Sequence, residues 1–396
     1  MSRIIIVNQQ YFPETAATGQ VFRMIAEDLA SRGHSVAVVC GRPFYPGVAR
    51  QVSPVETIGG VTVRRLWNTV FPKESIPGKA LNQLTFMVSL LWFALFSIQN
   101  DDNVLATTAP PLGVAGLALK RKITPFNLVM SVQDLYPDVL AAAGQASTKS
   151  WMFRVLRGIM MRCLQNCRTV AAVSTDMASH LRLFYKVADV RVIPNPSVHN
   201  VRPLPFGREK AARGWADKFV VQYSGNFGRA HEYKTLLVAM RLLSGRGDIL
   251  FHIAGGGSHF DALRVECGDM SNAVFEGFAP AEELSARLSI ADISLVIFDG
   301  AFRDVLLPSK YAGILASGRP VLLISGAVSD ISRDIERWGI GLQFGHGDGA
   351  AIADALAELA ADPARVQRMG SNSRQLYLSA YRNKDIFDAY ADILKL

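Results

Sequence analysis

The sequence IIIVNQQYFPETAATGQVFRMIAEDLASRGHSVAVV, residues 4–39, begins and ends with a short apolar run. Such runs are typical of buried parallel strands. Between them, apolar residues recur at helical spacing from Val21 to Leu29, and the pattern ends at Gly33, a residue type that often terminates helices. A strand, a loop, a helix and a second strand within about 40 residues form a βαβ unit. The stretch therefore predicts a parallel sheet with a right-handed crossover.

The same alternation continues in two blocks along the chain, which has 396 residues, 49% of them hydrophobic, and so suits roughly two domains. Between the blocks, the segment IPNP at residues 193–196 indicates an extended linker. We predict an α/β architecture in which two Rossmann-like parallel-sheet domains, residues 1–198 and 206–379, face a cleft. A C-terminal helix within residues 380–396 should cross back to the first domain. Ligands of such sheets bind beyond the carboxyl ends of the strands.

The formal net charge is +8, so the surface attracts anions such as nucleotide phosphates, anionic lipid headgroups or nucleic acid. The sequence has no RNA-binding aromatic signature and no zinc-finger spacing, so nucleic acid is the least favoured of these partners. The four cysteines are too scattered for a disulfide framework, and the N-terminal apolar run is too short for a signal peptide. We therefore expect a cytoplasmic location.

One segment, residues 80–100, contains no charged residue, and its part from Leu84 to Ile98 is almost wholly apolar. A spanning helix needs about 20 apolar residues, and this segment lies between strands of one predicted sheet. We therefore expect a helix that docks on the membrane interface, and a fully buried crossover helix is the alternative. The basic residues beside it are Arg64, Arg65, Lys73 and Lys79.

The segment PSKYAGILASGRPV, residues 308–321, is the most informative about a ligand site. Pro308 suits the start of a helix, and Ser309 suits a helix cap. Backbone N–H groups at such a start would point at an anion, and Lys310 would add a full positive charge. We predict that these three residues bind the phosphates of a donor, although an ordinary capped helix has the same pattern.

Glycines follow two predicted strands at the ends where ligands bind. Gly255 and Gly256 come directly after the strand expected at residues 249–254, and Gly19 lies beyond the loop that follows the first strand. Because glycine has no side chain, a donor molecule could approach the backbone closely at these places. We assign all three glycines to the donor site, and for the glycine run a tight turn is the alternative.

Acidic and polar residues follow strands of the first predicted domain. Asp134 comes after the strand expected at residues 128–132 and could orient or deprotonate an acceptor hydroxyl, so we assign it the catalytic role. A turn aspartate is the alternative. Glu14 and Asn8 follow the first strand and are assigned to acceptor binding. The sequence has no Asp-x-Asp triplet, so we expect neither a metal ion nor another cofactor.

Several segments together resemble the family 4 glycosyltransferases of the GT-B fold, and the resemblance covers nearly the whole chain. The branch that is most similar contains colanic-acid and O-antigen fucosyl- or N-acetylaminosugar transferases. The segments are YFPE (residues 11–14), GHSV (33–36), QDLYP (133–137), YSGNFG (223–228) and PSKYAGILASGRPV (308–321).

The resemblance implies transfer of a sugar from a UDP- or GDP-sugar, with retention of configuration and without a metal. It also implies an acceptor that is often a polyprenyl-diphosphate-linked saccharide, as in the biosynthesis of bacterial lipopolysaccharide and exopolysaccharide. Such an enzyme would be peripheral on the inner face of the bacterial inner membrane. We also assign Asn226, Arg229 and Phe278 to the donor site.

The chain departs from the family pattern at the phosphate and acceptor contacts. Asn226 and His231 stand where many members have an arginine and a lysine, so Arg229 or Lys310 would carry the phosphate charge. Asp134 stands where the family has an acceptor-side histidine. This substitution leaves open an inverting mechanism in which Asp134 is the general base.

The ribose contact also departs from the family pattern, because Val305 and Gly313 replace two glutamates. Glu276 and Asp304 are the candidate substitutes. The missing glutamates also leave a non-enzymatic alternative, a degenerate GT-B protein that scaffolds a polysaccharide assembly complex. A sugar-nucleotide epimerase of the same fold is a second alternative, whereas a dehydrogenase is disfavoured because no Gly-x-Gly-x-x-Gly follows the first strand.

Overall fold

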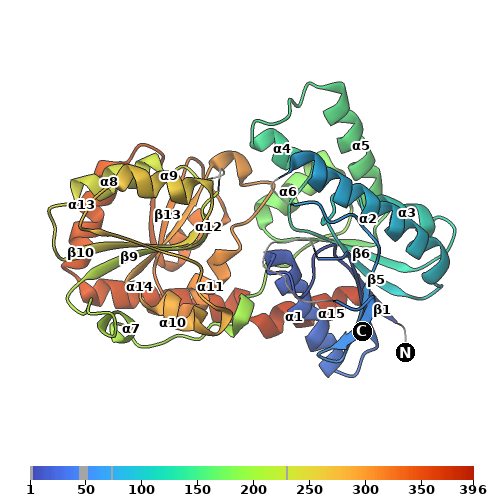
Figure 1. Cartoon of the computed structure of the whole chain (residues 1–396), viewed down its shortest axis with the longest axis horizontal. Coiled ribbons are helices and arrows are strands. Elements are labelled where there is room, and N and C mark those ends of the chain that lie inside the picture. Colours follow the sequence, from blue (N-terminus) through green and yellow to red (C-terminus); the bar gives the residue numbers. More distant parts are fainter. Residues whose placement is uncertain (1–2, 44–51, 73–74, 229–230) are drawn as a thin grey trace. The chain divides into compact units, whose positions relative to one another are not determined.

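The structure is a computed structural model that describes residues 3–43, 52–72, 75–228 and 231–396. The chain divides into two compact units (Figure 1). The first unit comprises Met1–Pro194, Asp304–Leu307 and Lys384–Leu396, and the second comprises Asn195–Arg303 and Pro308–Asn383. The inclusion of the short segment 304–307 in the first unit was not predicted from the sequence.

The first unit contains an eight-stranded sheet. Its strands are β1 (Ile4–Val7), β2 (Val36–Cys40), β3 (Val55–Ile58), β4 (Val61–Arg65), β5 (Asn103–Thr107), β6 (Asn127–Val132), β7 (Thr169–Ala172) and β8 (Val190–Val192). Their order is β3-β4-β2-β1-β5-β6-β7-β8, and every neighbouring pair is parallel except β3 and β4. The parallel sheet predicted from residues 4–39 is confirmed.

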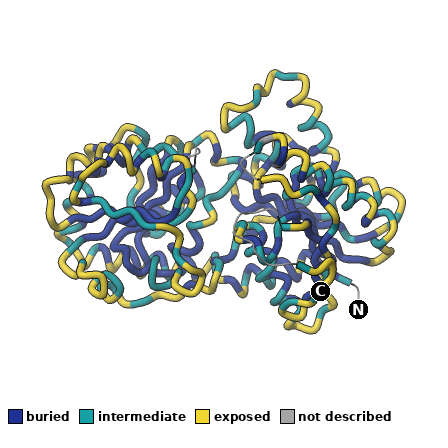
Figure 2. The backbone as a smooth tube through the Cα atoms, viewed as in Figure 1, coloured by how far each residue is buried: buried dark blue, intermediate teal, exposed yellow. Residues whose placement is uncertain are grey.

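Helices cover both faces of this sheet, which explains why strand β1 is apolar at every position. All four of its residues are buried, and Ile4 is paired with Val36 on one side and Asn103 on the other. The strands form the buried centre of the unit (Figure 2). The helices are α1 (Ala17–Ser31), α2 (Ile76–Ser97), α3 (Val114–Arg121), α4 (Asp138–Ala142), α5 (Trp151–Gln165), α6 (Thr175–Phe184) and α15 (Asn383–Leu394).

Helix α15 comes from the end of the chain and packs in the first unit. Its Tyr390 is completely buried, and the Tyr390 hydroxyl lies 2.8 Å from the hydroxyl of Ser131 on β6. The ring of Tyr390 also meets the ring of Phe22 on α1 edge-on, with the centroids 6.1 Å apart. These contacts confirm the predicted C-terminal helix that crosses back to the first domain.

The second unit contains a six-stranded sheet in which every paired strand is parallel. The strands are β9 (Phe219–Asn226), β10 (Ile249–Gly256), β11 (Ala273–Glu276), β12 (Ile293–Phe298), β13 (Val321–Ser325) and β14 (Gly341–Phe344). Their order is β11-β10-β9-β12-β13-β14. Two parallel α/β sheets in one chain are therefore present, as the sequence predicts.

Helices also cover both faces of the second sheet (Figure 1). Its main core lies between the strands and helices α8 and α13, where apolar side chains of β9, β10 and β12 pack together. The helices are α7 (Arg208–Ala211), α8 (Lys234–Leu242), α9 (Ser258–Cys267), α10 (Leu284–Ser289), α11 (Lys310–Ser317), α12 (Asp330–Trp338), α13 (Gly349–Ala360) and α14 (Pro363–Leu376).

Candidate functional site

The carboxyl ends of three neighbouring strands meet in the second unit. Strand β9 ends at Asn226, β10 at Gly256 and β11 at Glu276, and Gly255 lies opposite Gly225 in the register. A Cβ atom on Gly255 would lie 1.9 Å from the carbonyl oxygen of Gly225, and Gly255 has a φ of +139°. Only glycine allows the two strand ends to approach so closely. The result is a backbone edge without side chains at Gly225, Gly255 and Gly256, here called the glycine edge, at the end of the sheet where ligands usually bind.

Lys310, the first residue of α11, extends its side chain to this edge. Its Nζ lies 3.5 Å from the centroid of the Tyr223 ring, and a Cβ atom on Gly225 would lie 3.6 Å from its Cε. The Nζ atom is buried and has no hydrogen-bond partner among the described residues. Burial lowers the pKa of Lys310 well below its ordinary value. An ammonium group in such a place lacks acceptors, which the oxygens of a bound anion would supply.

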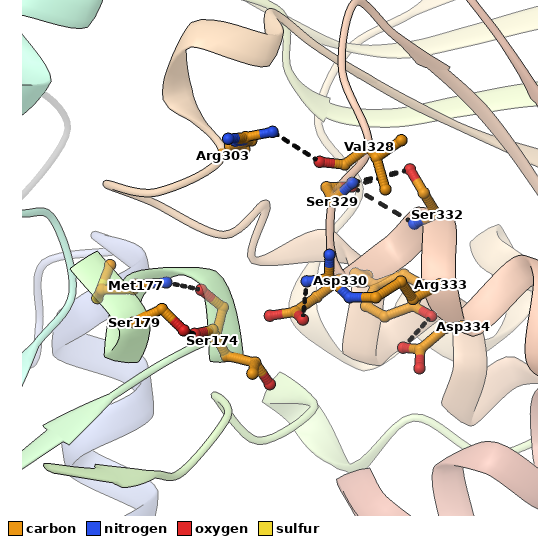
Figure 3. Close-up of polar contacts among 12 residues, drawn as sticks. Ser174, Met177, Ser179, Arg303, Val328, Ser329, Asp330, Ser332, Arg333 and Asp334 are labelled. Atoms are coloured by element: carbon orange, nitrogen blue, oxygen red, sulfur yellow. Dashed lines mark hydrogen bonds and ion pairs between the residues drawn. The ribbon is translucent and has the colours of Figure 1, made fainter. Parts of the chain in front are cut away.

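Helix starts in the second unit differ in whether their free N–H groups are already bonded. Helix α12 has a capping box in which Ser329 accepts a hydrogen bond from the N–H of Ser332 (Figure 3). Glu232 accepts hydrogen bonds from the first N–H groups of α8. No side chain caps α9 or α11. Helices α7, α10 and α13 also begin without a side-chain cap. The start of α9 follows the glycines of β10, and the start of α11 carries Lys310, so these two starts suit an anion.

The predicted cap at Ser309 is wrong. Ser309 is exposed, its side chain makes no capping hydrogen bond, and α11 begins at Lys310, two residues after the predicted start at Pro308. Instead, the carbonyl of Pro308 accepts a hydrogen bond from the N–H of Tyr311 at 3.1 Å. The hydroxyl of Ser309 is therefore available for a ligand.

The remaining predicted donor residues surround the glycine edge. Asn226 is exposed, and its carbonyl accepts a hydrogen bond from the Tyr223 hydroxyl at 2.7 Å. Phe278 is 66% exposed, and its ring would lie 3.1 Å from a Cβ atom on Gly256. An exposed aromatic ring beside bare backbone suits the face of a nucleobase. Arg229 lies outside the described residues.

Sequence reasoning did not assign His231 and Tyr223 to the site. The ring of His231 stands nearly perpendicular to that of Tyr223, with the centroids 5.9 Å apart. Tyr223 thus contacts both His231 and Lys310. The tyrosine in strand β9 was visible in the sequence, but its cation–π contact with Lys310 has no sequence signature.

Neither candidate for the ribose carboxylate is free. Glu276 is ion-paired with Arg213 at 2.5 Å and with Arg287. Asp304 belongs to the first unit, where its carboxylate lies 3.8 Å from His180. Among the described residues, no group of three or more His, Cys, Asp or Glu side chains could hold a metal ion.

Asp134 follows strand β6 of the first unit, in a loop that Thr108 holds in place. The hydroxyl oxygen of Thr108 accepts hydrogen bonds from the N–H groups of Gln133 and Asp134, at 3.1 and 3.3 Å. The Asp134 carboxylate is accessible to water, but surrounding protein atoms desolvate it and raise its pKa, which the charge of Lys79 partly offsets. A carboxylate of raised basicity suits proton transfer from a hydroxyl.

A buried ionic network anchors the end of this loop. The carboxylate of Asp138, at the start of α4, accepts hydrogen bonds from the hydroxyl of Tyr185 and from His180, and Arg157 lies 3.5 Å away. Burial opposes ionisation of Asp138, but these partners together lower its pKa. The network fixes the backbone that follows Asp134.

The other predicted residues of the first unit are buried. Asn8 is completely buried: its amide oxygen accepts from the Thr107 hydroxyl at 2.7 Å, and its amide nitrogen donates to the carbonyl of Gln10. Asn8 therefore shapes the loop before α1 and presents no free amide to an acceptor. Glu14 is only 4% exposed. A Cβ atom on Gly19 would lie 3.1 Å from the Gln10 carbonyl oxygen, so glycine is needed there for packing.

Helix α2 carries an exposed apolar stripe. It is long and apolar enough to span a membrane, although 28% of its most apolar window is buried. One face packs inside the unit through Phe86, Leu90 and Ala94, which conflicts with a helix that spans a membrane. The opposite face is exposed, which conflicts with the fully buried alternative. The stripe consists of Leu84 (56% exposed), Val88 (51%), Trp92 (61%) and Phe96 (75%).

The basic residues expected beside this stripe divide into two groups. Lys79 and Arg64 are exposed, and the guanidinium of Arg64 lies 5.6 Å from the centroid of the Phe93 ring. Arg65 is buried and ion-paired with Glu56, so it cannot contribute to a charged surface. Lys73 lies outside the described residues.

Comparison with known proteins identifies relatives over most of the chain. Residues 17–196 match the glycosyl transferase 4-like domain. The Pseudomonas aeruginosa protein named as glycosyltransferase WbjE is 26% identical over 374 residues, which cover 91% of this chain and 90% of that one. The Escherichia coli K12 protein named as colanic acid biosynthesis glycosyl transferase WcaI is 24% identical over 349 residues, with 84% and 85% covered.

Solved structures share the fold. Sucrose-phosphate synthase from Thermosynechococcus elongatus superimposes with a TM-score of 0.79 at 18% identity, over 100% of this chain and 98% of that chain. Anabaena HepE, in complex with UDP and glucose, superimposes with a TM-score of 0.71 at 14% identity over 100% of both chains. The chain therefore has the GT-B fold.

We predict that Lys310→Met stabilises the ligand-free protein near pH 7, by on the order of 1 kcal/mol, because it removes a buried charge without acceptors. The folded-state pKa of Lys310 is lowered, so the cost of its charge is present below about pH 10, where the unfolded chain is protonated, and fades as the pH rises toward that value. Thermal unfolding at about pH 7 and pH 9.5 measures both effects.

The matched control is Lys234→Met, which changes an exposed lysine of the same unit and should shift stability by less than about 0.5 kcal/mol. A clear loss of stability in Lys310→Met at neutral pH would show that the lysine supports the fold and is not held for a ligand.

Proposed function

Because the chain is a glycosyltransferase of the GT-B fold with a glycosyl transferase 4-like domain, we propose that it transfers a sugar from a UDP- or GDP-sugar to a polyprenyl-diphosphate-linked saccharide. The reaction belongs to the biosynthesis of a bacterial surface polysaccharide and proceeds with retention, without a metal or other cofactor. The observation that carries this proposal is the buried Nζ of Lys310, which has no hydrogen-bond partner among the described residues.

The donor occupies the glycine edge of the second unit. Its diphosphate lies against Lys310 and the uncapped helix starts, and its base stacks on Phe278. Ser309 and Asn226 are exposed beside this place and bond donor hydroxyls or phosphate oxygens. Two relatives support the class of reaction: HepE is in complex with UDP and glucose, and WcaI is named for colanic acid biosynthesis.

In the reaction, the bond between the anomeric carbon and the diphosphate breaks, and a bond from the acceptor oxygen to that carbon forms. The diphosphate leaves with the electron pair, and the Lys310 ammonium stabilises its charge. The proton of the acceptor hydroxyl passes to the leaving phosphate oxygen if configuration is retained, with Asp134 orienting the hydroxyl. If configuration is inverted, Asp134 takes this proton as general base.

UDP should stabilise the wild-type protein against heat, by about 2.7 kcal/mol at 100 times its dissociation constant. Lys310→Met should weaken UDP binding by roughly 10- to 100-fold, because a charged hydrogen bond contributes about 1.5–3 kcal/mol. Isothermal titration calorimetry measures the dissociation constants, with GDP as the second ligand and Lys234→Met as the control. Equal affinity of Lys310→Met and wild type for both nucleotides would refute the proposed donor site.

Asp134→Asn should lower the rate of sugar transfer to a bacterial membrane extract by about 10²- to 10⁴-fold, because the neutral amide neither holds the acceptor hydroxyl through a charge-assisted hydrogen bond nor takes its proton. UDP affinity should not change, since the donor contacts lie in the second unit. Asp101→Asn is the control, because Asp101 lies in an exposed turn of the same unit. Transfer of labelled sugar at the wild-type rate by Asp134→Asn would remove Asp134 from the mechanism.

The lipid-linked acceptor requires access to the inner leaflet, and we assign this contact to the stripe on α2. Its exposed side chains recur at four-residue spacing on one helix face, and exposed cationic residues lie nearby. Such a face would bury its apolar side chains at the headgroup boundary while the cations meet anionic lipids. The protein would then be peripheral on the cytoplasmic face of the inner membrane.

The wild-type protein should float with vesicles that contain phosphatidylglycerol and much less with pure phosphatidylcholine vesicles. The double substitution Trp92→Glu and Phe96→Glu should abolish flotation, because each buried side chain contributes about 1.5–3 kcal/mol. Val265→Glu, an exposed apolar position on α9 of the second unit, is the control and should float normally. Undiminished flotation of the double variant would exclude this stripe as the membrane contact.

A further inference from the structure

His231 and Lys310 both contact the ring of Tyr223 at the proposed diphosphate site, and the imidazole of His231 is held in one orientation. Its Nδ1 lies 3.0 Å from the carbonyl oxygen of Gly228, so Nδ1 carries a hydrogen and donates it. The ring stands edge-on to Tyr223 and to Phe227, with interplanar angles of 86° and 80°. These three contacts fix the direction of the other ring nitrogen.

That other nitrogen, Nε2, has no hydrogen bond among the described residues. With the hydrogen on Nδ1, a neutral imidazole presents a lone pair at Nε2, which would repel a phosphate oxygen. A protonated imidazole presents an N–H there, which a phosphate oxygen would accept. The ligand and the proton at His231 are therefore coupled.

The surroundings keep His231 neutral in the free protein. Burial is the largest cause, the charge of Lys310 adds to it, and His259 contributes, so that the pKa of His231 falls to about 4. His259 donates from Nδ1 to the His231 carbonyl at 2.7 Å. The nearest carboxylate along the chain, Glu232, faces the N–H groups that start α8. No described carboxylate therefore pairs with the imidazole.

We propose that His231 is a second, proton-coupled contact for the nucleotide diphosphate, neutral in the free protein and protonated when the diphosphate binds beside Lys310. This inference rests on the proposed donor site. In this proposal His231 binds the diphosphate directly and is charged only when the anion is present. The empty site therefore avoids a second buried cation near Lys310.

The coupling sets the direction of the pH dependence. Since the diphosphate binds the protonated imidazole better, binding raises the pKa of His231, and the protein takes up a proton from solvent. Nucleotide affinity should then fall as the pH rises from the free pKa toward the bound pKa, by up to about tenfold per pH unit. Product release would be faster at higher pH for the same reason.

Calorimetric titration of the full chain with UDP in buffers of different ionisation enthalpy measures the proton uptake. At about pH 7, His231→Asn and His231→Gln should each take up fewer protons than wild type, by up to one. Asn keeps a donor for the Gly228 carbonyl, whereas Gln can reach the phosphate without titrating. The ionisation of UDP itself is common to all variants and cancels in the difference. His34→Asn, in the first unit, is the control and should match wild type.

A second measurement uses the wild-type protein alone and does not depend on how the variants fold. The Cε1–H resonance of His231, assigned by its absence in His231→Gln, should move to the imidazolium position when UDP is added at about pH 7. An unmoved resonance, or equal proton uptake by wild type and both variants, overturns the inference while the donor site stands. Absent UDP binding, or binding unaffected by Lys310→Met, instead refutes the donor site itself.

Discussion

The ammonium group of Lys310 rests on the ring of Tyr223 with no hydrogen-bond acceptor among the described residues. Burying an ion costs several kcal/mol, and a desolvated cation–π contact returns about 2 kcal/mol. The remaining deficit is what an anion would relieve. The glycines of β9 and β10 keep side chains away from this place, and the starts of α9 and α11 have no side-chain cap. Among the described residues, none supplies an anionic partner to Lys310, so the site suits an anion from a ligand.

The first unit presents different functional groups from those around Lys310 in the second unit. There Asp134 follows β6 in a loop whose N–H groups are bonded to Thr108, and its carboxylate remains accessible to water. The stripe on α2 leaves large apolar side chains exposed on a helix whose other face is packed. A hydroxyl-bearing acceptor with a lipid anchor would suit both features, whereas a phosphate-bearing donor suits the second unit. In the proposed reaction, the first unit would bind the acceptor and the second unit would bind the donor.

Most of the fold could be predicted from the sequence, because buried parallel strands such as Ile4–Val7 are apolar at every position and alternate with helical patterns. Long-range details could not. The membership of residues 304–307 in the first unit depends on tertiary contacts, including the hydrogen bond from the Leu135 N–H to the Val305 carbonyl at 2.9 Å. Lys310 was predicted from its place at a helix start, but the contacts of His231 and Lys310 with the Tyr223 ring join residues from different elements and form only in the folded protein.

The most direct test of this account is a crystal structure of the protein with UDP bound. The account predicts a phosphate oxygen within hydrogen-bond distance of the Lys310 Nζ, at about 2.7–2.9 Å, with the base on Phe278. If UDP binds elsewhere while the Lys310 ammonium stays on the Tyr223 ring without an anion, the buried charge has another purpose and the central claim is wrong.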